Sequence, residues 1–237
     1  MSHFKACIFD VFGTVVDWRS SVSRFSQSYF NDKGIDIEGL AFADFWRGRY
    51  APSMAVIRAG NRGYVALDQL HFENLESTLE EFGLQNKLNT NEKWQLNTAW
   101  EQLDPWPAAA AGLTRLKQHA IIAPCSNGSI ALMTRLAKYG GLPWDCILGA
   151  EISQNYKPEP EVYLACCRAL RLPENEVMMV AAHNSDLDAA REVGLQTAFI
   201  ARPTEYGTQQ TNDLEPSSDW EYVITDFAEL SGPAQGQ

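Results

Sequence analysis

One stretch near the N-terminus decides the fold of this chain: Lys5-Ala6-Cys7-Ile8-Phe9-Asp10-Val11-Phe12-Gly13-Thr14. Its apolar run predicts a buried strand that ends on the carboxylate of Asp10. Burial of an ionised aspartate without partners is costly, and open α/β sheets bind ligands beyond the carboxyl ends of their strands. The stretch alone leaves two interpretations of Asp10 open, a helix cap and a nucleophile.

The composition is that of an ordinary globular protein, with 45% hydrophobic and 21% charged residues in a chain of 237. A formal net charge of -11 argues against nucleic acid as a partner, because its phosphates require clustered lysine and arginine. The five cysteines are scattered without the spacing of a zinc site, and no apolar run reaches membrane-spanning length. We therefore expect a cytoplasmic protein with free thiols and no membrane partner.

The periodicity of the chain divides it into a helical part and an alternating part. Residues near 17 to 100 carry helical patterns, although Pro52 should interrupt the pattern over residues 40–57. From Pro105 onward short apolar strands alternate with helices, which indicates a parallel sheet covered on both faces. Pro124 is awkward in a central strand, so that strand is expected to stop early. The predicted class is α/β, with a discontinuous Rossmann-like core of residues 1–16 and 101–237 and an inserted all-helical cap domain of residues 17–100.

Polar residues follow several of the predicted strands, in the segments Asp10–Thr14, Ser126-Asn127, Lys157-Pro158 and Ala181–Asp188. This quartet, with a helical insert after its first member, resembles the haloacid dehalogenase superfamily across nearly the whole chain. Within that superfamily the resemblance is greatest to the type II L-2-haloacid dehalogenases. The residues that carry it are Phe9–Thr14, Phe45-Trp46-Arg47, Cys125–Ser129, Tyr156-Lys157-Pro158 with Val162-Tyr163, and Asp186.

Position 12 distinguishes two subclasses of this superfamily. Its phosphatases carry a second aspartate two residues after the nucleophile, as an acid and base, whereas this chain has Phe12. They also hold magnesium with an acidic residue where this chain reads Ala181-Ala182-His183. A halide leaving group needs no proton. The resemblance therefore implies dehalogenation of a small 2-halocarboxylate without a metal or another cofactor.

The resemblance also implies a displacement in two steps. Asp10 attacks the carbon that bears the halogen and forms an ester, and water then attacks the carboxyl carbon of Asp10 and frees a 2-hydroxy acid. Lys157 sits beside Asp10 and keeps it ionised, because a nearby positive charge lowers the pKa of a carboxyl group. Outside the quartet, Lys157 would be read as an exposed lysine before a turn proline.

Several residues are expected to hold the substrate or the halide. The hydroxyls of Thr14 and Ser126 would orient Asp10 or the substrate carboxylate, while a turn or helix cap is the alternative role of Ser126. Arg47 resembles the arginine that receives the halide in the family, and Arg49 is close enough in sequence to compete for that role. The remaining expected substrate-binding or halide-binding residues are Val11, Phe12, Asn127, Tyr163 and Asn184.

The segment after the strand near residue 180 departs from better-known family members. They read Ser-Ser-Asn-Ala-Trp-Asp where this chain has Ala181-Ala182-His183-Asn184-Ser185-Asp186. Asp186 is expected to activate water or to orient Lys157, with a helix N-cap as its alternative role and Asp188 as its competitor. His183 is either the base for ester hydrolysis or a hydrogen-bond partner of Asp10.

Two other functions remain open at this stage. One is a magnesium-dependent phosphatase of the same fold, and the other is a binding protein that has lost its chemistry. The resemblance further implies a homodimer, and some members of the group accept fluoroacetate besides other haloacetates.

Overall fold

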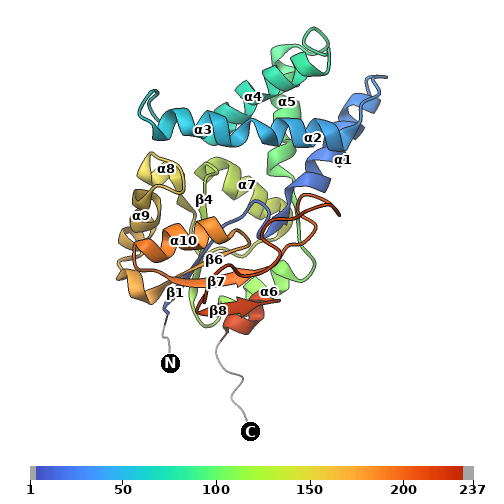
Figure 1. Cartoon of the computed structure of the whole chain (residues 1–237). Helices are drawn as coiled ribbons and strands as arrows, with labels where there is room; N and C mark the ends of the chain where they lie inside the picture. The colour runs from blue at the N-terminus through green and yellow to red at the C-terminus, as the bar shows by residue number, and fades with distance from the viewer. Residues whose placement is uncertain (1–3, 232–237) are drawn as a thin grey trace.

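A computed structural model describes residues 4–231, and it has an α/β fold (Figure 1). Its main sheet has six strands, which all pair in parallel in the order β5-β4-β1-β6-β7-β8. The strands are β1 (Ala6–Phe9), β4 (Ile121–Ser126), β5 (Leu148–Gly149), β6 (Val177–Ala181), β7 (Gln196–Ile200) and β8 (Tyr222–Ile224). The Rossmann-like prediction is confirmed, and it places Asp10 at the end of an interior strand.

Helices cover both faces of this sheet because its strands are apolar on both sides. On one face Ala6 and Ile8 of β1 belong to a cluster with residues of α9 (Pro160–Leu170) and α10 (Asn184–Glu192). On the other face Cys7 and Phe9 belong to a cluster with residues of α6 (Ala109–Leu116) and α7 (Ile130–Gly140). The smaller helices of this part are α8 (Ala150–Ser153), η2 (Glu174–Glu176) and η3 (Phe227–Leu230).

The inserted part is helical, as its periodicity predicted. It consists of α1 (Trp18–Asn31), α2 (Gly39–Gly48), α3 (Tyr50–Arg58), α4 (Leu67–Glu81), α5 (Thr90–Asn97) and η1 (Thr98–Glu101). Figure 1 shows these helices as one layer above the sheet, so we call them the cap helices. Within this layer the chain breaks at Arg49, between α2 and α3, because Pro52 fits the first turn of a helix better than its interior.

The chain enters and leaves the cap helices through one small antiparallel ribbon. β2 (Val16–Asp17) pairs with β3 (Asp104–Pro105), so the two crossings lie side by side. Asp17 also begins the first cap helix, since its side chain accepts a hydrogen bond from the backbone N–H of Ser20. We propose that the domains divide at this ribbon, within a few residues of the boundaries expected from the sequence.

The expectation about Pro124 was wrong. β4 continues through Pro124 to Ser126, and Pro124 is paired in register with Phe9. Ile121 donates its backbone N–H to Lys5 on the β1 side, and because residues alternate along a strand, Pro124 faces the β5 side. There the pairing to β5 involves only Cys125 and Ser126, so the missing N–H of proline costs no ladder hydrogen bond.

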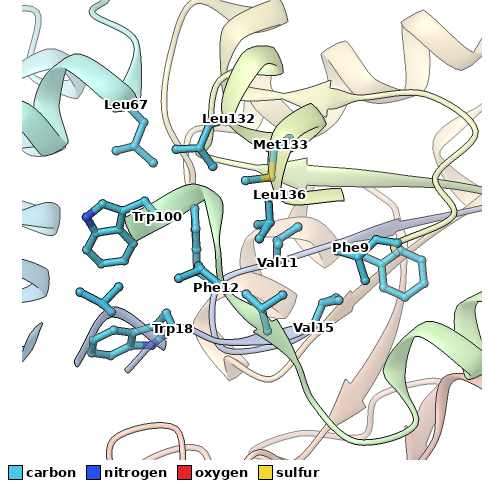
Figure 2. Packing of buried hydrophobic residues seen from close by; sticks show 14 of the residues in the cluster. Phe9, Val11, Phe12, Val15, Trp18, Leu67, Trp100, Leu132, Met133 and Leu136 are labelled. Carbon is cyan, nitrogen blue, oxygen red and sulfur yellow. The ribbon is translucent and has the colours of Figure 1, made fainter. Parts of the chain in front are cut away.

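An apolar cluster joins the sheet to the cap helices (Figure 2). Phe12 meets Trp100 edge to face, with ring centroids 6.1 Å apart, and Trp100 stacks on Trp18 at 6.3 Å. Figure 2 also shows Leu132, Met133 and Leu136 of α7 and Leu67 of α4 in this cluster. Phe12, two residues after the expected nucleophile Asp10, is therefore part of the packing that holds the cap helices over the sheet. Among residues 4–231 the structure has no helix that is long and apolar enough to cross a membrane.

Candidate active site

Asp10 lies at the end of β1 and is buried among partners from several loops. Lys157 donates from Nζ to Oδ1 of Asp10 over 2.9 Å. Thr14 donates its hydroxyl to Oδ2 over 2.7 Å, and Nδ1 of His183 lies 3.2 Å from the same oxygen. The predicted neighbours Thr14, Lys157 and His183 therefore all meet at the one carboxylate.

These partners set the charge of Asp10. Burial alone would raise the pKa of Asp10, but the charge of Lys157 and the hydrogen bonds from His183 and Thr14 outweigh it, so the pKa lies well below its usual range. Both oxygens are therefore negatively charged at neutral pH. Two cationic side chains and a hydroxyl surround them, which is a poor setting for a divalent cation because it adds positive charge where acidic ligands would be needed.

Lys157 is shared between two carboxylates. Its Nζ donates to Asp10 and, over 2.5 Å, to Oδ2 of Asp186, while Tyr163 donates its hydroxyl to the other oxygen of Asp186. Burial alone would lower the pKa of Lys157, but Asp10 and Asp186 raise it, so the ammonium keeps its proton. Asn127 accepts the backbone N–H of Lys157 over 2.8 Å and fixes the loop that carries it. Asp186 therefore makes the predicted contact with Lys157, and it also lies in the cavity wall, where a water molecule could reach it.

His183 lies between two carboxylates as well. Its Nε2 is 2.9 Å from Oε2 of Glu205, on the side opposite Asp10. Burial would lower the pKa of His183, but the hydrogen bonds to Asp10 and Glu205 raise it well above its ordinary value. The imidazole is therefore protonated at neutral pH, which makes it a donor to Asp10. Glu205 was not identified from the sequence.

A cavity of about 240 Å³ opens in front of Asp10. Arg47, Tyr50 and Arg58 line it from the cap helices, and the remaining lining residues are Asp10, Phe12, Ala51, Met54, Asn127, Lys157, Pro158, His183, Ser185 and Asp186. Arg58 donates to the backbone carbonyl of Lys157 over 3.2 Å and so spans the gap between α3 and the sheet. Arg58 was not identified from the sequence, because an arginine at the end of an amphipathic helix is usually a solvated residue.

Arg47, rather than Arg49, faces this cavity. The guanidinium of Arg47 lies 3.9 Å from the ring centroid of Tyr50, and its Nη1 is buried without a hydrogen-bond partner among residues 4–231. A buried cationic donor without an acceptor is costly, so this atom is suited to an anion. Arg49 is exposed and lies over Phe45 instead. A second cavity of about 350 Å³ borders the far side of Arg47, next to Trp18 and other residues.

Three predicted substrate-binding residues have other contacts. Tyr163 is fully buried behind Asp186, and the side chain of Val11 packs in the apolar cluster. The carboxamide of Asn184 accepts from Ser217 and Trp220 and donates to the 213–215 segment, so it fixes a loop. In each case the side chain points into the protein and does not line the cavity.

Ser126 and Asp188 also lie away from the cavity wall. Oγ of Ser126 accepts the backbone N–H of Gly128 over 3.1 Å, which is the turn role that the sequence left open. Asp188 is exposed on α10, one residue outside the buried turn that holds Asp186. Among the predicted residues, those that line the cavity are Asp10, Phe12, Arg47, Asn127, Lys157, His183 and Asp186. Thr14 does not line it but donates a hydrogen bond to Asp10.

Comparison with known proteins identifies the family. A model of haloacid dehalogenase-like hydrolases matches residues 4–194, which is most of the chain. The chain belongs to this family. It is 31% identical over 208 residues to (S)-2-haloacid dehalogenase 4A from Burkholderia cepacia, covering 85% of this chain and 86% of that protein.

Solved structures of related proteins have the same fold as this haloacid dehalogenase-like hydrolase. The defluorinating L-2-haloacid dehalogenase Rha0230 superposes with a TM-score of 0.94 at 45% identity, covering 96% of this chain and 94% of the other. The L-2-haloacid dehalogenase PA0810 superposes with a TM-score of 0.92, also at 45% identity, covering 96% and 97%. The resemblance inferred from the loop motifs is therefore confirmed at the level of the family.

Proposed function

We propose that this hydrolase converts short 2-haloalkanoic acids to 2-hydroxy acids through an ester on Asp10. The observation that carries the proposal is a bare carboxylate, held ionised by Lys157 at 2.9 Å, that faces a small cavity with Phe12 in place of a second acid. The similarity to (S)-2-haloacid dehalogenases supports the same conclusion independently. Asp10, Lys157 and Arg47 are its main residues.

In the first step Oδ1 of Asp10 is the attacking atom. This oxygen accepts one hydrogen bond, from Lys157, whereas Oδ2 contacts both Thr14 and His183 and has less freedom to form a bond. An electron pair of Oδ1 forms the new C–O bond from the side opposite the halogen, and the C–X pair leaves with the halide. The buried Nη1 of Arg47 is the proposed donor to that halide.

In the second step water hydrolyses the ester. Its oxygen adds to Cγ of Asp10, one of its protons passes to Asp186, and negative charge develops on Oδ2. When the carbonyl forms again, the bond from Cγ to Oδ1 breaks, and the leaving alkoxide takes up the proton that Asp186 received. The second proton of the water leaves the Asp10 carboxyl group to solvent, which restores the carboxylate. The net reaction consumes one water and releases the hydroxy acid, the halide and one proton. His183 is not the base in this proposal, because its contacts with Asp10 and Glu205 raise its pKa and keep the proton on the imidazole.

The cavity matches a small anion. Its lining carries Arg47, Arg58, Lys157 and His183 against only Asp10 and Asp186, which leaves an excess of positive charge for the carboxylate of the substrate. A cavity of about 240 Å³ accommodates haloacetates and other short 2-haloalkanoates. Fluoroacetate belongs to the proposed range, because the similar Rha0230 protein is a defluorinating enzyme.

The proposal is tested by measuring halide. Purified protein is incubated with chloroacetate, bromoacetate and fluoroacetate in metal-free buffer, and free halide is quantified with and without EDTA. We expect EDTA-independent release that Asp10→Asn abolishes, while Asp188→Asn, an exposed carboxylate on α10, leaves it unchanged. Absence of halide from every substrate would overturn the proposal. Phosphate release that EDTA abolishes would instead indicate a phosphatase, and inactivity of every kind would indicate a binding protein.

We also propose that the enzyme is cytoplasmic and that it forms a homodimer. Free cysteines support a reducing compartment, since all five lack a disulfide partner. Light scattering on the eluting protein tests the dimer directly, and a mass of 26.5 kDa would show a monomer instead.

A further inference from the structure

Glu205 is a buried carboxylate behind the proposed active site. It lies in the loop after β7, outside every helix and strand, and only 1% of its surface is exposed. Its Oε1 accepts from the indole Nε1 of Trp18 over 2.9 Å, and its Oε2 lies 2.9 Å from Nε2 of His183. Carboxylates are seldom fully buried unless they are paired, so this position requires both partners.

Two neighbouring contacts place Glu205 against the nucleophile loop. Arg202 donates from Nε to the backbone carbonyl of Thr14 over 2.9 Å, and Glu205 donates its own backbone N–H back to Arg202. Gly13 has a φ of +91°, and a Cβ atom added there would lie 2.1 Å from Oε1 of Glu205. The loop after β7 and the loop after β1 are therefore fitted to each other around this carboxylate.

We propose that Glu205 is a positioning residue, which holds His183 as an imidazolium whose Nδ1–H donates to Oδ2 of Asp10. The inference rests on the proposed function and concerns its second step. When water adds to the ester, the charge that develops on Oδ2 meets two donors, the hydroxyl of Thr14 and the imidazolium of His183. Donors already directed at the developing charge are the most effective form of electrostatic stabilisation.

The timing of charge in the reaction explains why a second carboxylate is needed. Before the reaction the imidazolium of His183 lies between Asp10 and Glu205, and both stabilise its proton. Once Asp10 becomes an ester it carries no charge, so Glu205 is then the one carboxylate in contact with the imidazole among residues 4–231. Without Glu205, His183 would lose its charge at the stage when Oδ2 needs it.

Other charged groups around His183 modify this balance without replacing it. Lys157 and Asp186 from the core and Arg47 from α2 share the cavity wall with His183, and Tyr206 lies next to Glu205 in the loop after β7. Lys157 and Asp186 form an ion pair with each other, so their net influence on the imidazole is small. Arg47 and Arg58 add positive charge to the same cavity wall, which disfavours a further cation there, and the contact with Glu205 offsets this.

The first experiment compares the two steps in Glu205→Gln. The substitution removes the charge and nearly preserves the shape. We expect hydrolysis of the ester to slow about tenfold or more while its formation slows much less, because a charge-assisted donor is replaced by a neutral one. Rapid quenching with bromoacetate followed by mass spectrometry should therefore show Asp10 ester accumulating. Glu221→Gln is the matched control, since Glu221 accepts from Thr197 far from the cavity.

The second experiment measures the protonation of His183 without using activity. The wild-type chain contains four histidines, and His183→Gln assigns the signal of His183 in a ¹⁵N NMR titration. We expect the wild-type signal to titrate above the ordinary range near 6.5, and Glu205→Gln to move it down by at least one unit. A titration at the ordinary value in the wild type would overturn the inference even if Glu205→Gln does not fold.

The two proposals fail in different ways. No halide from the wild type would overturn the proposed function. Normal halide release, with no ester accumulation and no change in the titration of His183 in Glu205→Gln, would overturn the role of Glu205 alone. Equal slowing of both steps with an unchanged titration would show that Glu205 only supports the packing around Trp18, and the inference would fail there too.

Discussion

The side chains around Asp10 differ most clearly in which of its oxygens they contact. Oδ1 receives one ammonium donor, whereas Oδ2 is next to a hydroxyl and an imidazolium. That asymmetry follows from topology, because Lys157 arrives from the β5 side and His183 from the β6 side of the same strand. A single carboxylate can thereby present one oxygen to carbon and keep the other for the charge of the second step.

The titration of His183 should be visible in the stability of the protein. Its folded pKa is raised, so its contribution is fully present below the unfolded value near 6.5 and is lost as the pH rises toward the folded pKa. Urea unfolding should be measured between pH 5 and 9. The free energies of unfolding of the wild type and His183→Gln should converge above about pH 6.5, by up to about 1.4 kcal/mol per pH unit. A difference that grows with pH would contradict the assignment.

His71 should show the opposite sign. It is buried and stacks on Trp100, with ring centroids 4.3 Å apart, and burial together with Arg47 lowers its pKa well below the ordinary value. A depressed histidine pKa means that the unfolded chain takes up the proton first, so stability falls below about pH 6.5. Replacement of His71 by Phe should remove that acid sensitivity in the same urea experiments.

Sequence reasoning predicted Asp10, Lys157 and Asp186 and, through the family resemblance, Arg47, but it missed Glu205 and Arg58. Asp10, Lys157 and Asp186 could be placed together because the carboxyl ends of parallel strands share one edge. Glu205 could not, since it lies in an irregular loop and its partner Trp18 is 187 positions away. Asn184 was assigned to the pocket on position alone, although its carboxamide is fully used by another loop.

At the scale of secondary-structure elements, the loops after β1 and β7 depend on each other through Gly13. We expect Gly13→Ala to destabilise the fold by about 2 kcal/mol or more, from backbone strain at positive φ and from displacement of Glu205. Halide release should fall with it. Gly34→Ala is the control, because Gly34 also has positive φ but an added Cβ meets nothing within 4 Å. That variant should cost about 1 kcal/mol and keep full activity.

Helix α3 is fastened to the core by the hydrogen bond from Arg58 to the carbonyl of Lys157. Arg58→Met should raise KM for chloroacetate about tenfold, because it removes both this bond and a positive charge from the cavity wall, and kcat should change less. Steady-state kinetics measure the split. Arg62→Met provides the comparison, since Arg62 pairs with Glu73 within the cap helices and should leave KM unchanged. Equal kinetic constants for the two variants would show that Arg58 does not contribute to substrate binding.

Across the whole molecule one apolar cluster extends through the sheet and the cap helices. Trp100 is central to it, with contacts to Phe12 at 6.1 Å and Trp46 at 5.5 Å. Its replacement by alanine should lower the free energy of unfolding by about 3–5 kcal/mol, whereas Trp94→Ala, at an exposed surface stack, should cost about 1 kcal/mol. Calorimetry and tryptophan fluorescence should report one coincident transition. Separate melting of the cap helices would show that the cluster does not couple them.

The two-strand ribbon between β2 and β3 has a consequence for substrate entry. Both chain crossings pass through it side by side, so the cap helices and the sheet are covalently joined along a single axis. Any swing about that axis carries Arg47 away from Asp10 and breaks the contact of Arg58, while the pair of Asp10 and Lys157 travels as one piece. We therefore expect that opening the proposed cavity to a haloacid would also separate Arg47 from Asp10, so that the proposed reaction requires the closed arrangement described here.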